Sequence, residues 1–431
     1  MRNCKIVIRL NALRKIDIVK VFSFTAISTL VKMLTSLISV KFVAIIIGPA
    51  GIALLGQLNN FSSIIMTVAC GGINNGVTKY IAENKDDDDI LKSYLSTSLR
   101  ITLFCSFICG VSLVFLNKWL SEIVFLSSSF GYVFIVFGFT LFLYALNMLL
   151  TSILNGFKEF RKYVLVNIAG SILGLIVTLL LVYYFELKGA LISAVTFQSI
   201  MFFVTLWMIR KLPWVNFSFF KEKFDSLIAK KYFKYTLMTF VTAATVPVSQ
   251  LLLRGYVISE ISIVEAGWWE SMNRISNMYL MVITSSLSVY YLPKLSEIKD
   301  SVLLRAEIFR AYKFIIPTIT ICFVLIYFLR MPIIRMLFTE DFNPMSNLFL
   351  WQLFGDFFKV ASWLLAFLMV AKTMTRKFIL TEILFSGILI VLGFTFININ
   401  GVVGITQAYA LTFLLYLFFM LFVFRKLLFV K

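Results

Sequence analysis

The sequence of 431 residues contains no histidine and only five cysteines, and it has far fewer acidic than basic side chains. Without histidine, a histidine triad, a histidine metal site and a histidine proton switch are all excluded. The cysteines show neither metal-ligand spacing nor the spacing of a disulfide framework; they are Cys4, Cys70, Cys105, Cys109 and Cys322. We therefore expect no metal, no cofactor and no catalytic residue.

Long polar segments are also missing. No loop is long enough to fold into a catalytic or nucleotide-binding domain, and the G-x-x-x-x-G-K-[ST] motif is absent. Residues 1–20 are basic but lack the compact apolar core and small-residue cleavage site of a signal peptide. The chain is predicted not to be an enzyme, and any work it performs must come from an ion gradient, the membrane potential or a downstream sink.

The sequence does contain many long apolar segments. It is 60% hydrophobic and 16% aromatic, with a mean hydropathy of +0.94. Apolar spans of about 20 residues match the thickness of a bilayer, and backbone amides in lipid find partners within one segment only in a helix. We predict an all-α integral membrane protein with about twelve transmembrane helices. The expected spans are 21–47, 52–80, 93–116, 131–154, 164–184, 189–209, 235–258, 264–291, 311–329, 346–371, 378–397 and 402–424.

The formal charge of +19 raises the question of nucleic acid, but the position of the charges argues against it. Most of the 40 lysines and arginines lie in the termini and in alternate loops, on one side of the predicted membrane. This is the positive-inside pattern of a bacterial inner (cytoplasmic) membrane protein with both termini in the cytoplasm. Membrane lipids with anionic head groups are the expected partners of these charges, and nucleic acid is not.

The two halves of the chain resemble each other. A shift of 215 residues aligns three basic groups: 161–165 with 376–380, Lys79 with Lys294, and 210–212 with 425–427. Such duplication is common in transporters, and six spans in each half require the repeats to be parallel. The predicted organisation is a basic N-terminus (1–20), an N-lobe (21–209), a cytoplasmic linker (210–234), a C-lobe (235–424) and a C-terminus (425–431).

Polar side chains form a stripe along one face in each of two corresponding spans. In the second span the stripe is Asn60, Ser63, Thr67, Gly71, Asn74 and Thr78. In the eighth it is Glu270, Asn273, Arg274, Asn277, Thr284 and Ser288. Such stripes either join helices or line a water-filled cavity. Because two matching spans carry them, a cavity shared by the two halves is favoured.

Charged residues inside the spans are mostly cations: Lys32, Lys41, Arg100, Arg254, Arg274 and Lys359, against Glu270 and Asp356. Glu270 and Arg274 are four residues apart and Asp356 and Lys359 three, so each pair forms either an ion pair or part of a binding site. Lys41 and Arg100 lie near span ends, where their side chains can reach the interface. Lys32 and Arg254 are left without an obvious acidic partner. Such an excess of cations suits an anionic cargo such as a diphosphate and suits a cationic drug badly.

Several local motifs resemble those of the Wzx-type flippases, a branch of the MOP exporter superfamily that translocates undecaprenyl-diphosphate-linked oligosaccharides for O-antigen and enterobacterial common antigen. The motifs are Gly48-Pro49-Ala50-Gly51, Asn75-Gly76-Val77-Thr78-Lys79-Tyr80, Tyr235-Thr236-Leu237-Met238, Ser288-Val289-Tyr290-Tyr291-Leu292-Pro293, Trp351-Gln352-Leu353-Phe354-Gly355-Asp356 and Gln407-Ala408-Tyr409. The resemblance covers residues 20–425. It implies two six-helix lobes around a central V-shaped cavity, with alternating access.

The resemblance also implies a cargo and partners. The cargo would be an undecaprenyl-diphosphate-linked glycan, and other surface-polysaccharide assembly proteins are further candidate partners. Lys32, Lys41, Arg254, Asp356 and Lys359 match charged positions of the family, whereas Glu270 and Arg274 match none. The candidates for the substrate cavity are Lys32, Lys41, Asn60, Asn74, Arg254, Arg274, Asp356 and Lys359. The alternatives are a multidrug or ion exporter of the same superfamily, and an oligosaccharide polymerase or ligase of the same pathway.

Overall fold

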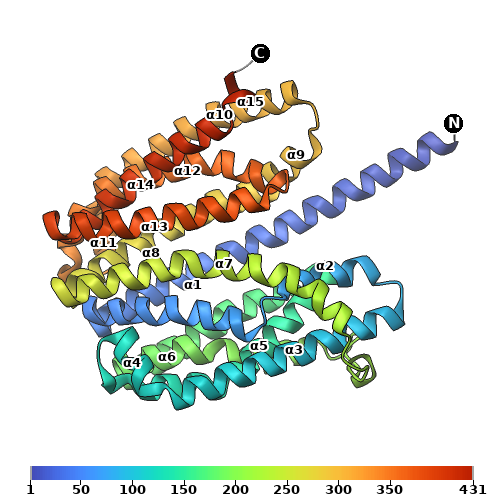
Figure 1. Cartoon of the computed structure of the whole chain (residues 1–431), viewed down its shortest axis with the longest axis horizontal. Coiled ribbons are helices and arrows are strands. Elements are labelled where there is room, and N and C mark those ends of the chain that lie inside the picture. The colour runs from blue at the N-terminus through green and yellow to red at the C-terminus, as the bar shows by residue number, and fades with distance from the viewer. Residues whose placement is uncertain (1, 430–431) are drawn as a thin grey trace.

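The protein is built from helices joined by short turns. The computed structural model describes residues 2–429, and it describes side chains for residues 26–428 apart from 234, 235, 238 and 289. No strand occurs among these residues. The helices form two bundles, one from the first half of the chain and one from the second (Figure 1).

The first half contains two long helices that each reverse direction within their length. Its elements are α1 (Arg2–Ala69), α2 (Asn74–Asn84), α3 (Asp88–Phe115), α4 (Asn117–Phe125), η1 (Ser128–Phe130), α5 (Gly131–Gly156) and α6 (Phe160–Ile209), followed by η2 (Phe217–Phe220). The backbone leaves the helical conformation at Gly48 in α1 and at Glu186 in α6. At the first break Gly48 has φ of 60°, and Pro49 starts the next helix, where its missing N–H costs nothing.

The second half repeats this order with separate helices. Its elements are α7 (Ser226–Glu260), α8 (Ile263–Ser286), the π-helical turn η3 (Leu287–Tyr291), α9 (Leu292–Glu297), α10 (Ser301–Phe328), α11 (Arg330–Leu337), η4 (Glu340–Leu348), α12 (Phe349–Ala371), α13 (Thr375–Asn400), α14 (Val402–Val423) and α15 (Arg425–Phe429). α1 packs against α7 and α8, and α7 packs against α13. The contacts of α1 with α7 and α8 join the two bundles, whereas the contact of α7 with α13 lies within the second.

The twelve predicted spans are present. Within the described chain, nine helices are long and apolar enough to cross a membrane, and α1 and α6 among them each contain two crossings. α8 matches the eighth predicted span but is not among the nine; besides Glu265, Glu270 and Arg274 it contains several Asn and Ser residues. The prediction of an all-α, multi-pass membrane protein is confirmed.

The backbone supports the 215-residue repeat. Lys158 and Thr373 both have positive φ, 60° and 53°. Glu186 and Gly401, at the same offset, have φ of 47° and 61°. Left-handed backbone is uncommon outside glycine, so two such coincidences at one offset indicate that the turns between matching helices have the same geometry. The parallel two-lobe arrangement is therefore evident in the turns as well as in the helix order.

The second predicted span, 52–80, is wrong as a single helix. α1 ends at Ala69, and Gly71 and Gly72 follow with φ of 67° and 63° before α2 begins. α7 lies against this turn: the Thr236 hydroxyl donates to the Gly71 carbonyl at 2.9 Å, and a Cβ on Gly72 would lie 3.1 Å from the Thr236 side chain. The polar stripe is consequently divided, with Asn60, Ser63 and Thr67 on α1 and Asn74 and Thr78 on α2.

The predicted linker, 210–234, contains the start of a helix. The 210–234 segment leaves α6 at Ile209, but α7 already begins at Ser226. The Asp225 carboxylate accepts hydrogen bonds from the backbone N–H groups of Leu227 (2.7 Å) and Ile228 (3.2 Å), which is an N-cap. Residues 430–431 of the predicted C-terminus lie outside the described chain.

The approach of α8 to the α1 turn gives a stability prediction. A Cβ on Gly267 would lie 2.0 Å from the Pro49 carbonyl oxygen, so Gly267→Ala must displace backbone. We expect a loss of about 1–3 kcal/mol, measured as thermal stability of the purified protein in detergent. Gly387→Ala in α13 is the control, since nothing lies within 4 Å of its added Cβ. It should be neutral or stabilise by about 0.5–1 kcal/mol. Equal melting temperatures for the two variants would contradict the close contact.

Candidate functional site

A polar cavity of about 710 Å³ lies within the first half of the chain. Its walls are the first part of α1, α5 and both parts of α6. The polar side chains that line it are Ser28, Thr29, Lys32, Thr35, Ser36, Ser39, Tyr144, Asn147, Thr151, Tyr163, Asn167, Ser171, Thr178 and Gln198. Of the 22 lining residues, 13 carry a hydroxyl or an amide and none carries a carboxylate.

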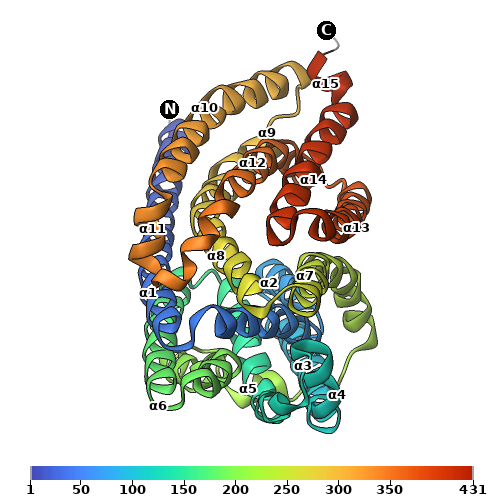
Figure 2. The same ribbon diagram turned by 90° about the vertical axis from the view of Figure 1, so that its left-hand side faces the viewer.

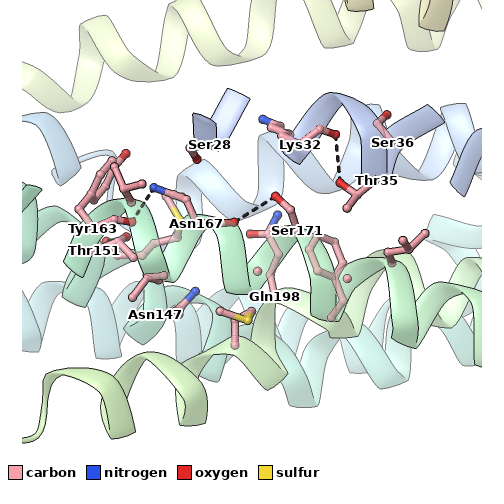
Figure 3. A pocket seen from close by; sticks show the side chains of 18 of the residues that line it. Ser28, Lys32, Thr35, Ser36, Asn147, Thr151, Tyr163, Asn167, Ser171 and Gln198 are labelled. Atoms are coloured by element: carbon pink, nitrogen blue, oxygen red, sulfur yellow. Dashed lines mark hydrogen bonds between the residues drawn. The ribbon is translucent and has the colours of Figure 1, made fainter. Parts of the chain in front are cut away.

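Lys32 is the only Lys or Arg side chain among the lining residues. Figure 3 shows Lys32 on α1, across the cavity from Asn167 and Ser171. Lys32 is exposed and forms no ion pair with any described residue. Asn167 donates to the Tyr163 carbonyl at 3.0 Å, and Ser171 donates to the Asn167 carbonyl at 3.0 Å. The cavity thus offers one unneutralised positive charge among neutral hydrogen-bonding groups.

Arg254, predicted to lack an acidic partner, has one. Its Nη2 lies 2.5 Å from Oε2 of Glu270, whose Oε1 lies 3.0 Å from Nε of Arg274. Gln57 Oε1 accepts a further hydrogen bond from Arg254 at 3.4 Å, and the guanidinium lies 5.3 Å from the ring centre of Trp269. The helical spacing identified the Glu270–Arg274 pair, but Arg254 is on α7 and meets Glu270 only when α7 packs on α8.

The cluster of Arg254, Glu270 and Arg274 lies where the two halves of the chain are in contact. α1 contributes Gln57 and also Gly56, where a Cβ would lie 2.6 Å from the Glu270 carboxyl carbon. Arg254 has a relative exposure of 0%, so it is not available to a cargo in this conformation. Removing one member of such a buried pair typically costs about 3–5 kcal/mol, because the other charge is left without a partner. Arg254 thus connects α7 to α8 through Glu270 and to α1 through Gln57, whereas Arg274 pairs with Glu270 within α8.

Asp356 on α12 is the centre of a second buried network. Its relative exposure is 0%, and it accepts hydrogen bonds from Ser276 Oγ (2.7 Å), the Tyr409 hydroxyl (2.7 Å) and the Tyr279 hydroxyl. Three hydroxyl donors from α8 and α14 therefore solvate a carboxylate that water does not reach.

Lys359 reaches Asp356 only through a tyrosine. No direct ion pair joins the two side chains among the described residues; instead Lys359 Nζ donates to the Tyr409 hydroxyl at 3.0 Å, and that hydroxyl donates to Asp356. The ammonium also lies 5.1–5.3 Å from the ring centres of Trp363, Tyr409 and Phe413. An ion pair was one of the two alternatives that the spacing left open, and in the structure Tyr409 relays the interaction between Asp356 and Lys359.

The other candidates lie apart from the cavity. Lys41 Nζ donates to the carbonyls of Arg335 (3.0 Å) and Phe338 (2.5 Å), which end α11 in the other half, and Figure 2 shows α1 reaching α11. Asn60 Nδ2 donates to Gln250 Oε1 on α7 at 3.2 Å. Asn74 begins α2, and its Oδ1 is buried without a hydrogen bond. Of the eight candidates, only Lys32 lines the cavity.

The sequence analysis did not identify two sets of residues that interact with the buried charges. Ser276, Tyr279 and Tyr409 surround Asp356, but hydroxyl residues are too common in membrane helices to single out. Glu382 on α13 is a further acid inside a predicted span, and it interacts electrostatically with Lys359. A complete count of charges within the spans would have found it. Among described residues, no group of three Cys, Asp or Glu is placed to hold a metal ion.

Comparisons with known proteins define the family. The family described as "Polysaccharide biosynthesis protein" matches residues 18–299. The chain is 30% identical over 405 residues to the "Lipid III flippase" of Escherichia coli (strain K12), covering 93% of this chain and 96% of that protein. The "Lipid III flippase" of Shigella flexneri matches equally well. The chain belongs to the polysaccharide biosynthesis protein family.

Solved structures of two transporter groups share the fold of this family member. An inward-facing multidrug resistance MATE transporter of the MOP superfamily has a TM-score of 0.76 at 13% identity, covering 92% of this chain and 95% of that one. The lipid II flippase MurJ in an inward closed conformation has a TM-score of 0.75 at 15% identity, covering 94% and 87%. The chain therefore has the same fold as these two transporters.

The Asp356 network gives a second prediction for this polysaccharide biosynthesis protein. Tyr409→Phe removes both the donor to Asp356 and the acceptor of Lys359, so it should lower the free energy of unfolding by about 1–3 kcal/mol. Tyr132→Phe is the matched control, because the Tyr132 hydroxyl is buried with no hydrogen-bond partner. Thermal melting in detergent measures both. If Tyr409→Phe proves as harmless as Tyr132→Phe, the relay does not stabilise the fold.

Proposed function

We propose that the protein is a flippase for an undecaprenyl-diphosphate-linked oligosaccharide, which it moves from the cytoplasmic to the periplasmic leaflet by alternating access. Full-length similarity to lipid III flippases supports the type of activity. The observation that carries the assignment is the cavity of the first half, with Lys32 as its single cation and no acidic side chain in its lining.

The lining of this cavity suits both parts of such a cargo. A diphosphate carries negative charge, and the unpaired ammonium of Lys32 is a flexible donor for it. Sugar hydroxyls both donate and accept hydrogen bonds, as do the amides of Asn147, Asn167 and Gln198. The buried Oδ1 of Asn147 has no partner within the described protein, so it is free to accept from a ligand.

A multidrug exporter is the competing function, because MATE transporters have the same fold. A cationic drug needs a carboxylate or an exposed aromatic face to offset its charge. Tyr144, Tyr163 and Phe197 are among the lining residues, but the lining contains no carboxylate, and Lys32 repels a cation. An oligosaccharide polymerase has weaker support, since the relatives that match over almost their whole length are named as flippases.

The remaining charged candidates are proposed to hold the two lobes in position during transport. Lys41 connects α1 to the end of α11, and Glu270 connects α7 and α8 beside α1. Asn60 connects α1 to α7 through Gln250. Asp356 and Lys359 stabilise the packing of α8, α12 and α14. In this proposal Lys32 contacts the cargo, and the other charges define the surfaces on which the lobes move.

Two further proposals concern the location of the protein and its partners. We place the protein in the bacterial inner membrane with both termini in the cytoplasm, an orientation supported by the even number of crossings and by the distribution of basic residues. Other surface-polysaccharide assembly proteins are proposed partners, because a flipped unit must be consumed on the far side of the membrane.

Lys32 provides the test of cargo binding. Losing a charge-assisted hydrogen bond worth about 1.5–3 kcal/mol should reduce surface glycan roughly tenfold or more in Lys32→Gln, at unchanged abundance in the membrane. Lys32→Arg should retain part of the activity, because the charge remains. Lys118→Gln on α4 is the control: it removes an exposed lysine outside the cavity. Complementation of a strain that lacks its own flippase measures the glycan, and normal glycan with abundant Lys32→Gln would refute the assignment.

The orientation is tested with alkaline phosphatase, a reporter that is active only in the periplasm. Fused after Lys431 it should be inactive, and inserted at the α6 reversal, after Glu186, it should be active. The two fusions control each other for expression. Activity of the Lys431 fusion with an inactive Glu186 fusion would reverse the proposed topology.

A further inference from the structure

A second cavity, of about 420 Å³, lies in the second half of the chain, where α12 and α14 end and α13 and α15 begin. One part of its lining is basic and consists of Lys377, Arg425 and Lys426. The other part is apolar and includes Leu380, Phe419 and Phe422. The cavity shares no residue with the Lys32 cavity and is outside the site described above.

The three cations have no internal counter-charge. None of the residues lining this cavity is acidic, and none of the three cations forms an ion pair within the described chain. All three side chains are exposed. The Arg425 guanidinium lies 4.5 Å from the ring centre of Phe422, which holds it at the edge of the apolar part.

The position of Lys377 on its helix strengthens this observation. α13 begins at Thr375 without a side-chain cap and carries Arg376 and Lys377 in its first turn. Positive charge at a helix N-terminus opposes the macrodipole, and the free N–H groups there favour an anion. An external phosphate would offset both the dipole and the lysine. The apolar residues alongside would not be needed for a free phosphate ion.

The basic residues recur at the same offset in the other lobe. Arg161 and Lys162 stand in the first turn of α6, and Arg210 follows its end with the guanidinium 5.3 Å from the ring centre of Trp207. The lysine of the first cavity does not recur at this offset, because Pro247 stands at the position that corresponds to Lys32. The basic clusters therefore belong to what the lobes share, which is contact with the surrounding bilayer.

We propose that the second cavity binds an anionic phospholipid, with its phosphate between Lys377, Arg425 and Lys426 and one acyl chain along Leu380 and Phe422. Leu380 and Phe422 are 67% and 60% exposed, so they already face the lipid phase. Basic pockets between transmembrane helices are a recognised way of holding such head groups. By the proposed orientation, the lipid comes from the cytoplasmic leaflet.

The test compares two triple variants of the full-length protein purified in detergent. Phosphatidylglycerol is titrated in, phosphatidylcholine serves as the neutral reference, and native mass spectrometry counts the bound lipid. Lys377→Gln, Arg425→Gln and Lys426→Gln together should weaken phosphatidylglycerol binding about tenfold and leave phosphatidylcholine unchanged. Lys223→Gln, Lys230→Gln and Lys299→Gln remove the same charge from exposed lysines outside the cavity and should change binding less than about twofold.

Three results would overturn the proposal. If both triple variants lost the same affinity for phosphatidylglycerol, the binding would be general electrostatic attraction. If neither lost affinity, the second cavity would not be a lipid site. If the first triple weakened binding of undecaprenyl diphosphate but not of phosphatidylglycerol, the cavity would belong to the cargo instead. Should the first triple fail to fold, Lys426→Gln alone is expected to weaken phosphatidylglycerol binding about threefold, and an unchanged affinity would have the same meaning.

Discussion

A bilayer offers no hydrogen bonds to a polypeptide, and the rest of this structure follows from that constraint. Backbone groups find partners only within helices, so the chain crosses as helices and reverses at short turns such as Gly48-Pro49. Polar side chains must turn inward and meet one another. The three-way contact of Arg254, Glu270 and Arg274 is the clearest case, because each of these charges would otherwise be stranded in an apolar interior.

The same constraint explains why tyrosine is so prominent in the second half. A carboxylate buried at 0% exposure needs donors, and Tyr279 and Tyr409 supply them without adding a charge. Tyr409 also accepts from Lys359, so one hydroxyl serves both ions. Hydrogen bonds from α8 and α14 to one carboxylate on α12 stabilise the packing of these three helices.

The two lobes have turns of the same backbone geometry but different polar side chains in their interiors. Matching turns at Glu186 and Gly401 show the common scaffold. Within it, the first half has a cavity that includes Lys32, whereas the second half contains the buried Asp356 network. The interiors of the two halves therefore carry different polar groups.

Hydropathy and spacing alone determined the class, the number of crossings and the repeat, because bilayer thickness and helix rise are the same for every membrane protein. They also singled out Lys32 as an unpartnered cation. Only tertiary packing decided the rest. Arg254 gained Glu270 from a neighbouring helix, Lys41 found carbonyls almost three hundred residues away, and α7 approached Gly72 closely where α1 ends. Spacing along one helix reports which residues share a face, but it does not report which helix that face will meet.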